Sequence, residues 1–101
     1  MNYNKNRGGD MAGKIFKKRS TFKYHASYAE TVFVAGSFNG WNSEANPMKR
    51  DKEGTWSTVV DLFSGTYEYR YIVDGQWKDD PTCKIRNVNQ YGGYNCVLVV
   101  D

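Results

Sequence analysis

One alternating stretch, SGTYEYRYIVDGQW at 64–77, constrains the fold of this chain more than any other feature. Its tyrosines recur at every second position, so they share one face of an extended strand and leave Arg70 on the other. Asp74 and Gly75 follow, a dipeptide that accepts positive φ and is typical of a tight reversal. The stretch predicts a strand with an inward tyrosine row, an outward Arg70 and a hairpin turn.

Four further runs have the composition of strands. The chain holds nine Val but only two Leu, with eight Tyr and five Phe, a bias toward side chains that fit pleated surfaces. No stretch combines a 3.6-residue period with helix caps, so we expect no sizeable helix. Short strands separated by turn signals predict an all-β fold, a sandwich or small barrel of about seven strands. The further runs are RSTFKYHA (19–26), TVFVAGSF (31–38), TWSTVVDLF (55–63) and YNCVLVVD (94–101).

Two core contacts are expected outside the tyrosine row. Trp56 alternates with Thr58 and Val60 on one side of its run, which favours an ordinary core position. Met48 is the expected core contact of the polar connection at 42–54. In the last run composition leaves two alternatives open: either Cys96, Leu98 and Val100 face inward, or Asn95, Val97 and Val99 do.

Length and charge predict one domain after a basic leader. A chain of 101 residues can bury one modest core and not a second. Residues 1–18 are polar and basic without a hydrophobic period, so we expect a disordered segment there and the β-sandwich domain at 19–101. The net charge of +3 comes largely from the first nineteen residues, so the field of the domain itself should steer ligands weakly.

The two cysteines, Cys83 and Cys96, have no CxxC or Cys/His neighbour that would suggest a zinc site. We interpret them as reduced thiols of a cytoplasmic protein. No apolar run has the length of a signal peptide core or a membrane span. We therefore expect a cytoplasmic location, no membrane partner, no metal and no cofactor.

Catalytic signatures are weak. His25 lies in an alternating strand with no nucleophile motif beside it. Asp74, Asp79 and Asp80 cluster as glycosidase carboxylates can, but Asp74 belongs to a turn and Asp80 precedes a proline as turn starters do. The segment 74–80 lacks the spacing of a calcium loop, and the glycines do not precede helices as phosphate loops require. We predict that the chain is not an enzyme.

Two tryptophans follow turn signals directly, Trp41 in FNGW and Trp77 in DGQW. Turns on a rigid frame can hold side chains outward. An exposed indole can stack on the flat apolar face of a sugar ring, because this contact leaves the hydroxyls at the rim hydrated. An indole folded back on the core is the alternative for either residue. Polar side chains suited to hydroxyls are Asn39, Asn42, Arg70, Gln76, Asn87, Asn89 and Asn95.

With GSFNGW at 36–41, and GTYEYRYIVDGQW at 65–77 followed by DDP, the sequence is similar to carbohydrate-binding module family 48. This glycogen-binding domain occurs in the β subunit of AMP-activated protein kinase and at the N-termini of isoamylase and glycogen-branching enzymes. The resemblance runs from about Thr21 to Val100. It implies an early-set immunoglobulin-like β-sandwich and non-catalytic binding of α-1,4-linked glucan such as glycogen or starch.

The resemblance also implies roles for single residues. A leucine that some members press into the glucan falls near Tyr91, and a threonine two residues later falls on Gly93. At these departures tyrosine offers a third stacking surface, whereas glycine removes a hydroxyl. The two stacking tryptophans fall on Trp41 and Trp77, the basic residue on Arg70, and the asparagine that contacts sugar on Asn95.

The expected ligand is an α-glucan polysaccharide or oligosaccharide, with a glycogen-metabolising enzyme or a kinase as a further partner. One alternative is a protein-interaction or regulatory module that has lost sugar binding. Another is single-stranded nucleic-acid binding through the tyrosines and the KIFKKR arm at 14–19. We do not expect nucleic acid, because the basic residues lie outside the patterned domain and not among its aromatics.

Overall fold

A computed structural model describes residues 16–101 and shows an all-β sandwich of two antiparallel sheets, which confirms the predicted fold class. Eight strands occur within these residues, three of them only two or three residues long, together with the single-turn 3-10 helix η2 (Ser37–Asn39). The strands are β1 (Lys18–His25), β2 (Val32–Gly36), β3 (Lys49–Arg50), β4 (Thr55–Leu62), β5 (Gly65–Val73), β6 (Gln76–Lys78), β7 (Arg86–Val88) and β8 (Tyr94–Val100).

The N-terminal boundary differs slightly from expectation. Lys18, which we placed in a disordered segment, is the first residue of β1 and pairs with Leu62 of β4. The rest of that prediction concerns mainly residues 1–15, which lie outside the described residues.

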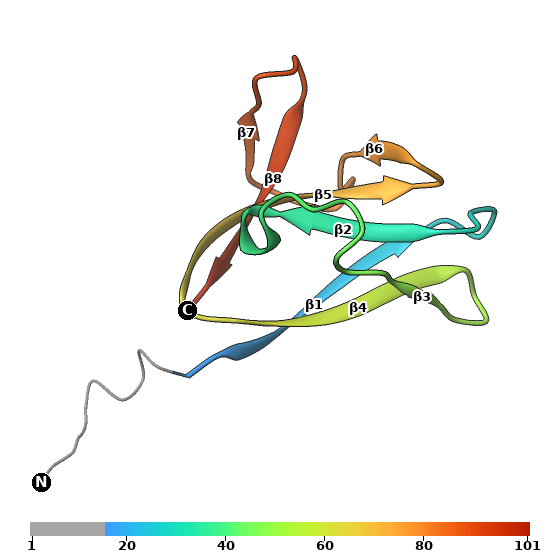
Figure 1. The fold of residues 1–101 in the computed structure, drawn as a ribbon, viewed down its shortest axis with the longest axis horizontal. Helices are drawn as coiled ribbons and strands as arrows, with labels where there is room; N and C mark the ends of the chain where they lie inside the picture. The colour runs from blue at the N-terminus through green and yellow to red at the C-terminus, as the bar shows by residue number, and fades with distance from the viewer. Residues whose placement is uncertain (1–15) are drawn as a thin grey trace, which may run out of the picture.

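Strand β5 organises the site because it lies at the centre of the larger sheet. One sheet has the order β1-β4-β3, and the other has the order β2-β5-β8-β7 with β6 also paired to β5. The register of β5 places Tyr71 opposite Val34 of β2 and Tyr69 opposite Cys96 of β8. In Figure 1 the β7–β8 hairpin and β6 lie at the top, away from the layer formed by β1 and β4. Residues of β5 therefore point either into the sandwich or toward these outer elements.

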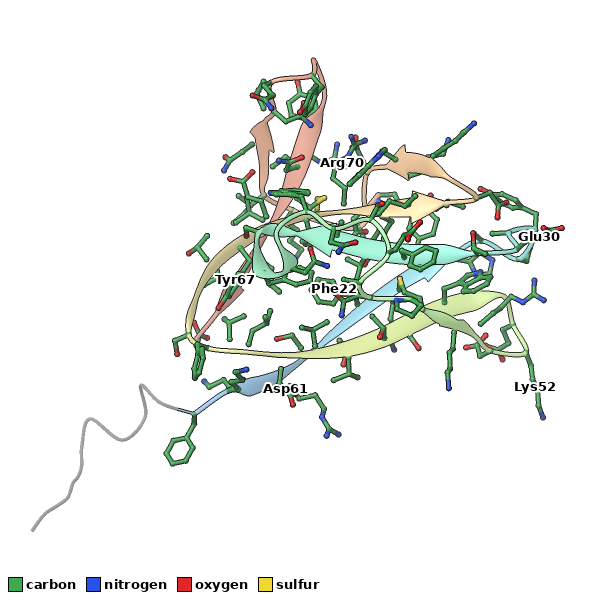
Figure 2. All side chains as sticks on the ribbon, in the orientation of Figure 1. Phe22, Glu30, Lys52, Asp61, Tyr67 and Arg70 are labelled. Atoms are coloured by element: carbon green, nitrogen blue, oxygen red, sulfur yellow. A yellow bond between two sulfur atoms is a disulfide. The ribbon has the colours of Figure 1, made fainter. Side chains whose placement is uncertain are left out.

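The inward tyrosine row is confirmed for Tyr69 and Tyr71, whereas Tyr67 is half-buried. Tyr69 and Tyr71 are buried, and the Tyr69 ring lies 5.1 Å from that of Phe22 on β1. Figure 2 shows Phe22 between the two layers and Arg70 on the outer side of β5. Each aromatic pair of this kind adds about 1 kcal/mol beyond its buried area. The alternation in the sequence thus separates the core from the outer face.

The other core predictions can now be assessed. Trp56 is only 7% exposed and its indole N–H donates to the Ala26 carbonyl at 2.9 Å, so the expected core position is confirmed. Met48 is buried as well. In β8, Cys96 and Val100 are buried and Leu98 packs against the core, which resolves the alternative that composition left open.

Our prediction of two reduced thiols is wrong, since Cys83 and Cys96 form a disulfide. Cys96 faces inward from β8, and the loop after β6 turns back so that the two Cα atoms lie 6.0 Å apart. A rule based on cellular compartment cannot detect this proximity, because it depends on the path of a loop.

Asp80 begins a turn, as the sequence indicated, but it also has a partner in the core. Its Oδ1 does accept the Thr82 N–H at 2.9 Å, as in a turn, but the residue is only 5% exposed. Its other oxygen accepts the Tyr69 hydroxyl at 2.6 Å. Asp80 therefore satisfies a buried polar group of the core.

Among residues 16–101 no helix has the length and apolar character of a membrane span.

Candidate functional site

Trp41 is held outward by a tight turn at the end of β2. A Cβ at Gly36 would collide with the Glu68 carbonyl and the Phe38 ring, so the chain needs glycine where it leaves the sheet. The Asn39 side-chain oxygen accepts a hydrogen bond from the Gly36 N–H at 3.1 Å, and the Trp41 N–H donates to the Gly36 carbonyl at 2.9 Å. Trp41 itself has φ of +60°, an uncommon value for a bulky residue. The turn therefore fixes the indole, which is 36% exposed.

Trp77 is held outward by the predicted hairpin between β5 and β6. Asp74 and Gly75 form its turn with φ of +49° and +82°, as the sequence indicated. The Asp74 carboxylate accepts the N–H groups of Glu30 and Thr31, which anchors the turn to the neighbouring loop. Trp77 pairs with Ile72 in the register and is 42% exposed.

The two indoles lie side by side although 36 positions separate them in the chain. Their ring centroids are 6.4 Å apart and their planes are inclined by 46°. Both line one concave surface together with Arg70. The pair therefore presents two adjacent, inclined aromatic faces.

Arg70 is fixed beside the two indoles by an ion pair. Its Nη2 lies 2.8 Å from Oδ1 of Asp79, and the two side chains are 20% and 37% exposed. Its Nε is buried and has no hydrogen-bond partner among the described residues. Because Asp79 engages only one nitrogen, other N–H groups of the guanidinium remain free to donate.

Asn95 belongs to a network of side chains centred on Glu68. The two carboxylate oxygens of Glu68 accept from Asn95 Nδ2 and Asn87 Nδ2, each at 3.0 Å. The Asn95 oxygen accepts from Asn89 Nδ2 at 3.1 Å. These bonds to the ionised carboxylate hold the pKa of Glu68 below its ordinary value. The side-chain amide of Asn95 is thus fixed in one orientation.

Tyr91 lies at the tip of the β7–β8 loop and is 83% exposed. The Asn89 side chain shapes this loop, because its oxygen accepts the N–H groups of both Tyr91 and Gly93. Gln90 Nε2 donates to the Tyr91 hydroxyl at 2.8 Å. The loop therefore carries a third aromatic ring at the rim of the same surface.

The structure brings all five sequence-predicted site residues to one groove of about 910 Å³. The sequence did not single out four others that line it, Ser37, Thr66, Glu68 and Gln90, since single polar residues in strands and turns give no distinct signal. Of the other predicted polar groups, Asn39 and Asn42 bind backbone N–H groups of their own turn instead. The groove is lined by Ser37, Trp41, Thr66, Glu68, Arg70, Trp77, Asn89, Gln90, Tyr91 and Asn95.

Comparison with known proteins gives related sequences with the same module. "Protein PTST homolog 2, chloroplastic" of Arabidopsis thaliana is 40% identical over 72 residues, which cover 71% of this chain and 13% of that protein. "Protein FLOURY ENDOSPERM 6, chloroplastic" of Oryza sativa subsp. japonica is 36% identical over 97 residues, 95% of this chain and 18% of the relative. Human 5'-AMP-activated protein kinase subunit beta-2 is 37% identical over 51 residues, 50% of this chain and 18% of the subunit.

The chain thus spans less than a fifth of the length of each of these relatives. The match to a family model is more extensive, since it covers residues 19–101 and so the whole sandwich apart from Lys18. The chain therefore belongs to the family described as the glycogen recognition site of AMP-activated protein kinase.

Proposed function

We propose that this domain binds α-1,4-linked glucan, such as glycogen or starch, without chemical conversion. The observation that carries the proposal is the pair of exposed indoles, Trp41 and Trp77, side by side in a groove rimmed by hydrogen-bonding side chains. Membership of a glycogen-recognition family supports it.

The groove suits sugar rings on physical grounds. Two adjacent glucose units of a curved chain present their faces at an angle, and the two indole planes are likewise inclined, by 46°. Each stacking contact should contribute about 1 kcal/mol beyond area burial, by analogy with aromatic pairs. With a few hydrogen bonds to hydroxyls, the total is about 4 to 8 kcal/mol, which corresponds to millimolar to micromolar dissociation constants.

The charges of the groove favour a neutral ligand over nucleic acid. Arg70 is the one cationic side chain among the described lining residues, and Asp79 already pairs with it. Glu68 adds a negative charge within the same groove. A phosphate backbone needs several unpaired cations along its path, and this surface does not offer them.

The role of the domain in a larger setting is also a proposal. We propose that it brings a glycogen-metabolising enzyme or a kinase to glucan, because one group of relatives consists of subunits of AMP-activated protein kinase. Two other relatives are named chloroplastic, and the cytoplasmic location expected from the sequence stays a prediction.

Calorimetry with β-cyclodextrin and native gel retardation with glycogen test the function. We expect measurable binding by the wild type and at least a roughly 10-fold loss for Trp41→Ala and for Trp77→Ala. Tyr28→Ala is the matched control, because Tyr28 is 71% exposed and does not line the groove. Absence of glucan binding by the wild type, or equal affinity of all variants, would refute the proposal; retention of RNA in the same gel would favour nucleic acid.

A further inference from the structure

Glu68 is the one carboxylate among the described residues that line the groove, and the family resemblance gave it no role. Its side chain projects from β5 on the same face as Arg70. A carboxylate in a surface strand would ordinarily be solvated and free to rotate. Here both oxygens are engaged by asparagine side chains from β7 and β8.

An ionised carboxylate can only accept hydrogen bonds, so it determines which end of each amide faces it. It requires Asn95 to point Nδ2 inward, and the Asn89 amide group occupies one lone pair of the Asn95 oxygen. Each side-chain amide has two N–H groups and two lone pairs. Asn95 therefore keeps one donor and one acceptor for a ligand, in a fixed orientation.

Glu68 is itself held in place from the other side of the groove. Its backbone N–H donates to the Ser37 hydroxyl at 3.1 Å, and Ser37 begins the helical turn η2 that leads to Trp41. In the β5–β8 ladder Glu68 lies opposite Val97. One residue thus connects the turn that carries the first indole with the strands that carry the asparagines.

We propose that Glu68 is a positioning residue for glucan binding, which acts by holding the Asn95 amide so that its free N–H and lone pair meet hydroxyl groups of one glucose unit. This inference rests on the proposed function. A sugar hydroxyl donates and accepts at once, so it gains most from an amide whose donor and acceptor are both held in place.

The positioning role of Glu68 requires an ionised carboxylate. The titratable or charged side chains that share the groove with it are Arg70, held by Asp79, and Tyr91. The two asparagine bonds lower the pKa of Glu68, so the carboxylate is fully ionised at neutral pH. Because the pKa is lowered, the hydrogen bonds of Asn87 and Asn95 to the carboxylate are fully present at any pH above the ordinary glutamate range. They are lost only as the pH falls through the lowered pKa.

The variant Glu68→Gln tests the proposal with little change in shape. Glutamine offers one acceptor oxygen and one donor group, so one of the two asparagines must then face a donor. By calorimetry with β-cyclodextrin we expect roughly 5- to 10-fold weaker binding. The matched control is Glu53→Gln in the turn before β4, an exposed glutamate outside the groove, which should bind as the wild type does.

A double-mutant cycle separates positioning from direct contact. If Glu68 acts through Asn95, Glu68→Gln should weaken binding little further once Asn95→Ala is present. An equal loss in both backgrounds would show that Glu68 contacts the sugar itself, and would overturn the positioning role. Unchanged affinity of Glu68→Gln in the wild-type background would also overturn it, whereas a wild type that binds no glucan would refute the proposed function instead.

A spectroscopic readout shows the network without ligand. In nitrogen-15 NMR spectra, the side-chain amide signals of Asn87 and Asn95 should shift together in the wild type as the pH falls below the ordinary glutamate range and Glu68 becomes protonated. In Glu68→Gln the shared shift should vanish while the backbone spectrum keeps its dispersion. Asparagine signals that titrate equally in both proteins would contradict the assignment.

Discussion

Arg70 lines the groove while paired with Asp79, and the orientation of its guanidinium depends on that carboxylate. Asp79 holds Nη2 at 2.8 Å and keeps the side chain four-fifths buried. Without this carboxylate the long side chain would sample several rotamers and lose entropy on binding sugar. Asp79 therefore serves ligand binding more than stability, since an ion pair whose carboxylate is 37% exposed contributes at most about 1 kcal/mol to folding.

The variant Asp79→Asn measures this role. We expect roughly 2- to 5-fold weaker binding of β-cyclodextrin by calorimetry, with a melting temperature close to that of the wild type. Asp61→Asn on β4 is the control, because Asp61 is exposed and lies outside the groove. Tighter binding after loss of the carboxylate would show instead that Asp79 competes with sugar for Arg70.

Tyr69 and Asp80 form a buried polar pair directly beneath the site. Burial, reinforced by the hydrogen bond to Asp80, raises the pKa of Tyr69 above its ordinary value of 10.0, so the phenol keeps its proton and donates. In Tyr69→Phe the buried Asp80 oxygen loses this donor. We expect a loss of about 1 to 3 kcal/mol in the free energy of unfolding, measured with urea.

The control for that experiment is Tyr94→Phe. Tyr94 is 47% exposed, so removal of its hydroxyl should change stability by less than about 0.5 kcal/mol. Equal effects of the two substitutions would mean that the Asp80 contact contributes nothing.

For single residues, the sequence predicts the side chains that strand β5 contributes to the site better than those of the loop after β6. Alternation places Arg70 outside and Tyr69 inside, because a period of two assigns every residue of a strand to a face. It cannot predict that Asp79 and Asp80, adjacent in the chain, diverge to Arg70 and to the core. That outcome depends on how the loop after β6 folds back over β5, and periodicity carries no information about loop paths.

At the scale of elements, the disulfide fastens the long connection from β6 to β7. Residues 79–85 contain no strand, yet they carry both aspartates and approach β8 through Cys83. The crosslink closes a loop with a sequence separation of 13 residues. In the chain-entropy view, such a bond stabilises the fold by about 3 kcal/mol, because it restricts the unfolded chain.

Replacement of both cysteines by alanine should therefore lower the free energy of unfolding by about 3 kcal/mol. Urea unfolding followed by tryptophan fluorescence measures it. The wild type under reducing conditions is the control, because it loses the bond but keeps both sulfur atoms in the core. Stability unaffected by reduction would contradict a structural role for the disulfide.

Long strands were predictable and short ones were not. The runs that became β1, β2, β4, β5 and β8 alternate or are rich in β-branched residues. Strand β3 has two residues inside a polar connection, and β7 has three exposed residues. Such short strands are defined by their neighbours, as β7 is by pairing Asn87 with Asn95, and not by their own composition.

For the whole molecule, the meeting of the two tryptophans follows from topology. Strand β2 pairs with β5, and β6 returns along β5 from the hairpin turn, so FNGW and DGQW are both brought to the same strand. The motifs identified these residues, but propensity alone could not predict that the indoles meet. The pairing order of the sheet produces that contact, and it also brings Asn95 and Tyr91 to the groove through β8, which pairs with β5 on the same side as β6.

The basic segment and the groove differ in charge, and this difference allows a neutral glucan ligand to be distinguished from a nucleic acid. The net charge is +3, and the basic segment Lys14 to Arg19 contributes four of the cations. The groove itself combines Arg70 with the carboxylate Glu68, and Arg70 is also paired with Asp79. A neutral glucan releases no counterions when it binds here, whereas a nucleic acid attracted by the basic segment would release several.

Glucan affinity should accordingly change by less than about 2-fold between roughly 50 mM and roughly 500 mM NaCl, because stacking and hydroxyl contacts are not screened. Calorimetry with β-cyclodextrin at the two salt concentrations measures this. Binding of a single-stranded RNA oligonucleotide under the same conditions should weaken steeply, and a variant with Lys17, Lys18 and Arg19 replaced by alanine should lose it without loss of glucan affinity. A glucan affinity that fell in parallel with RNA binding would mean that the basic segment, and not the tryptophan groove, holds the ligand.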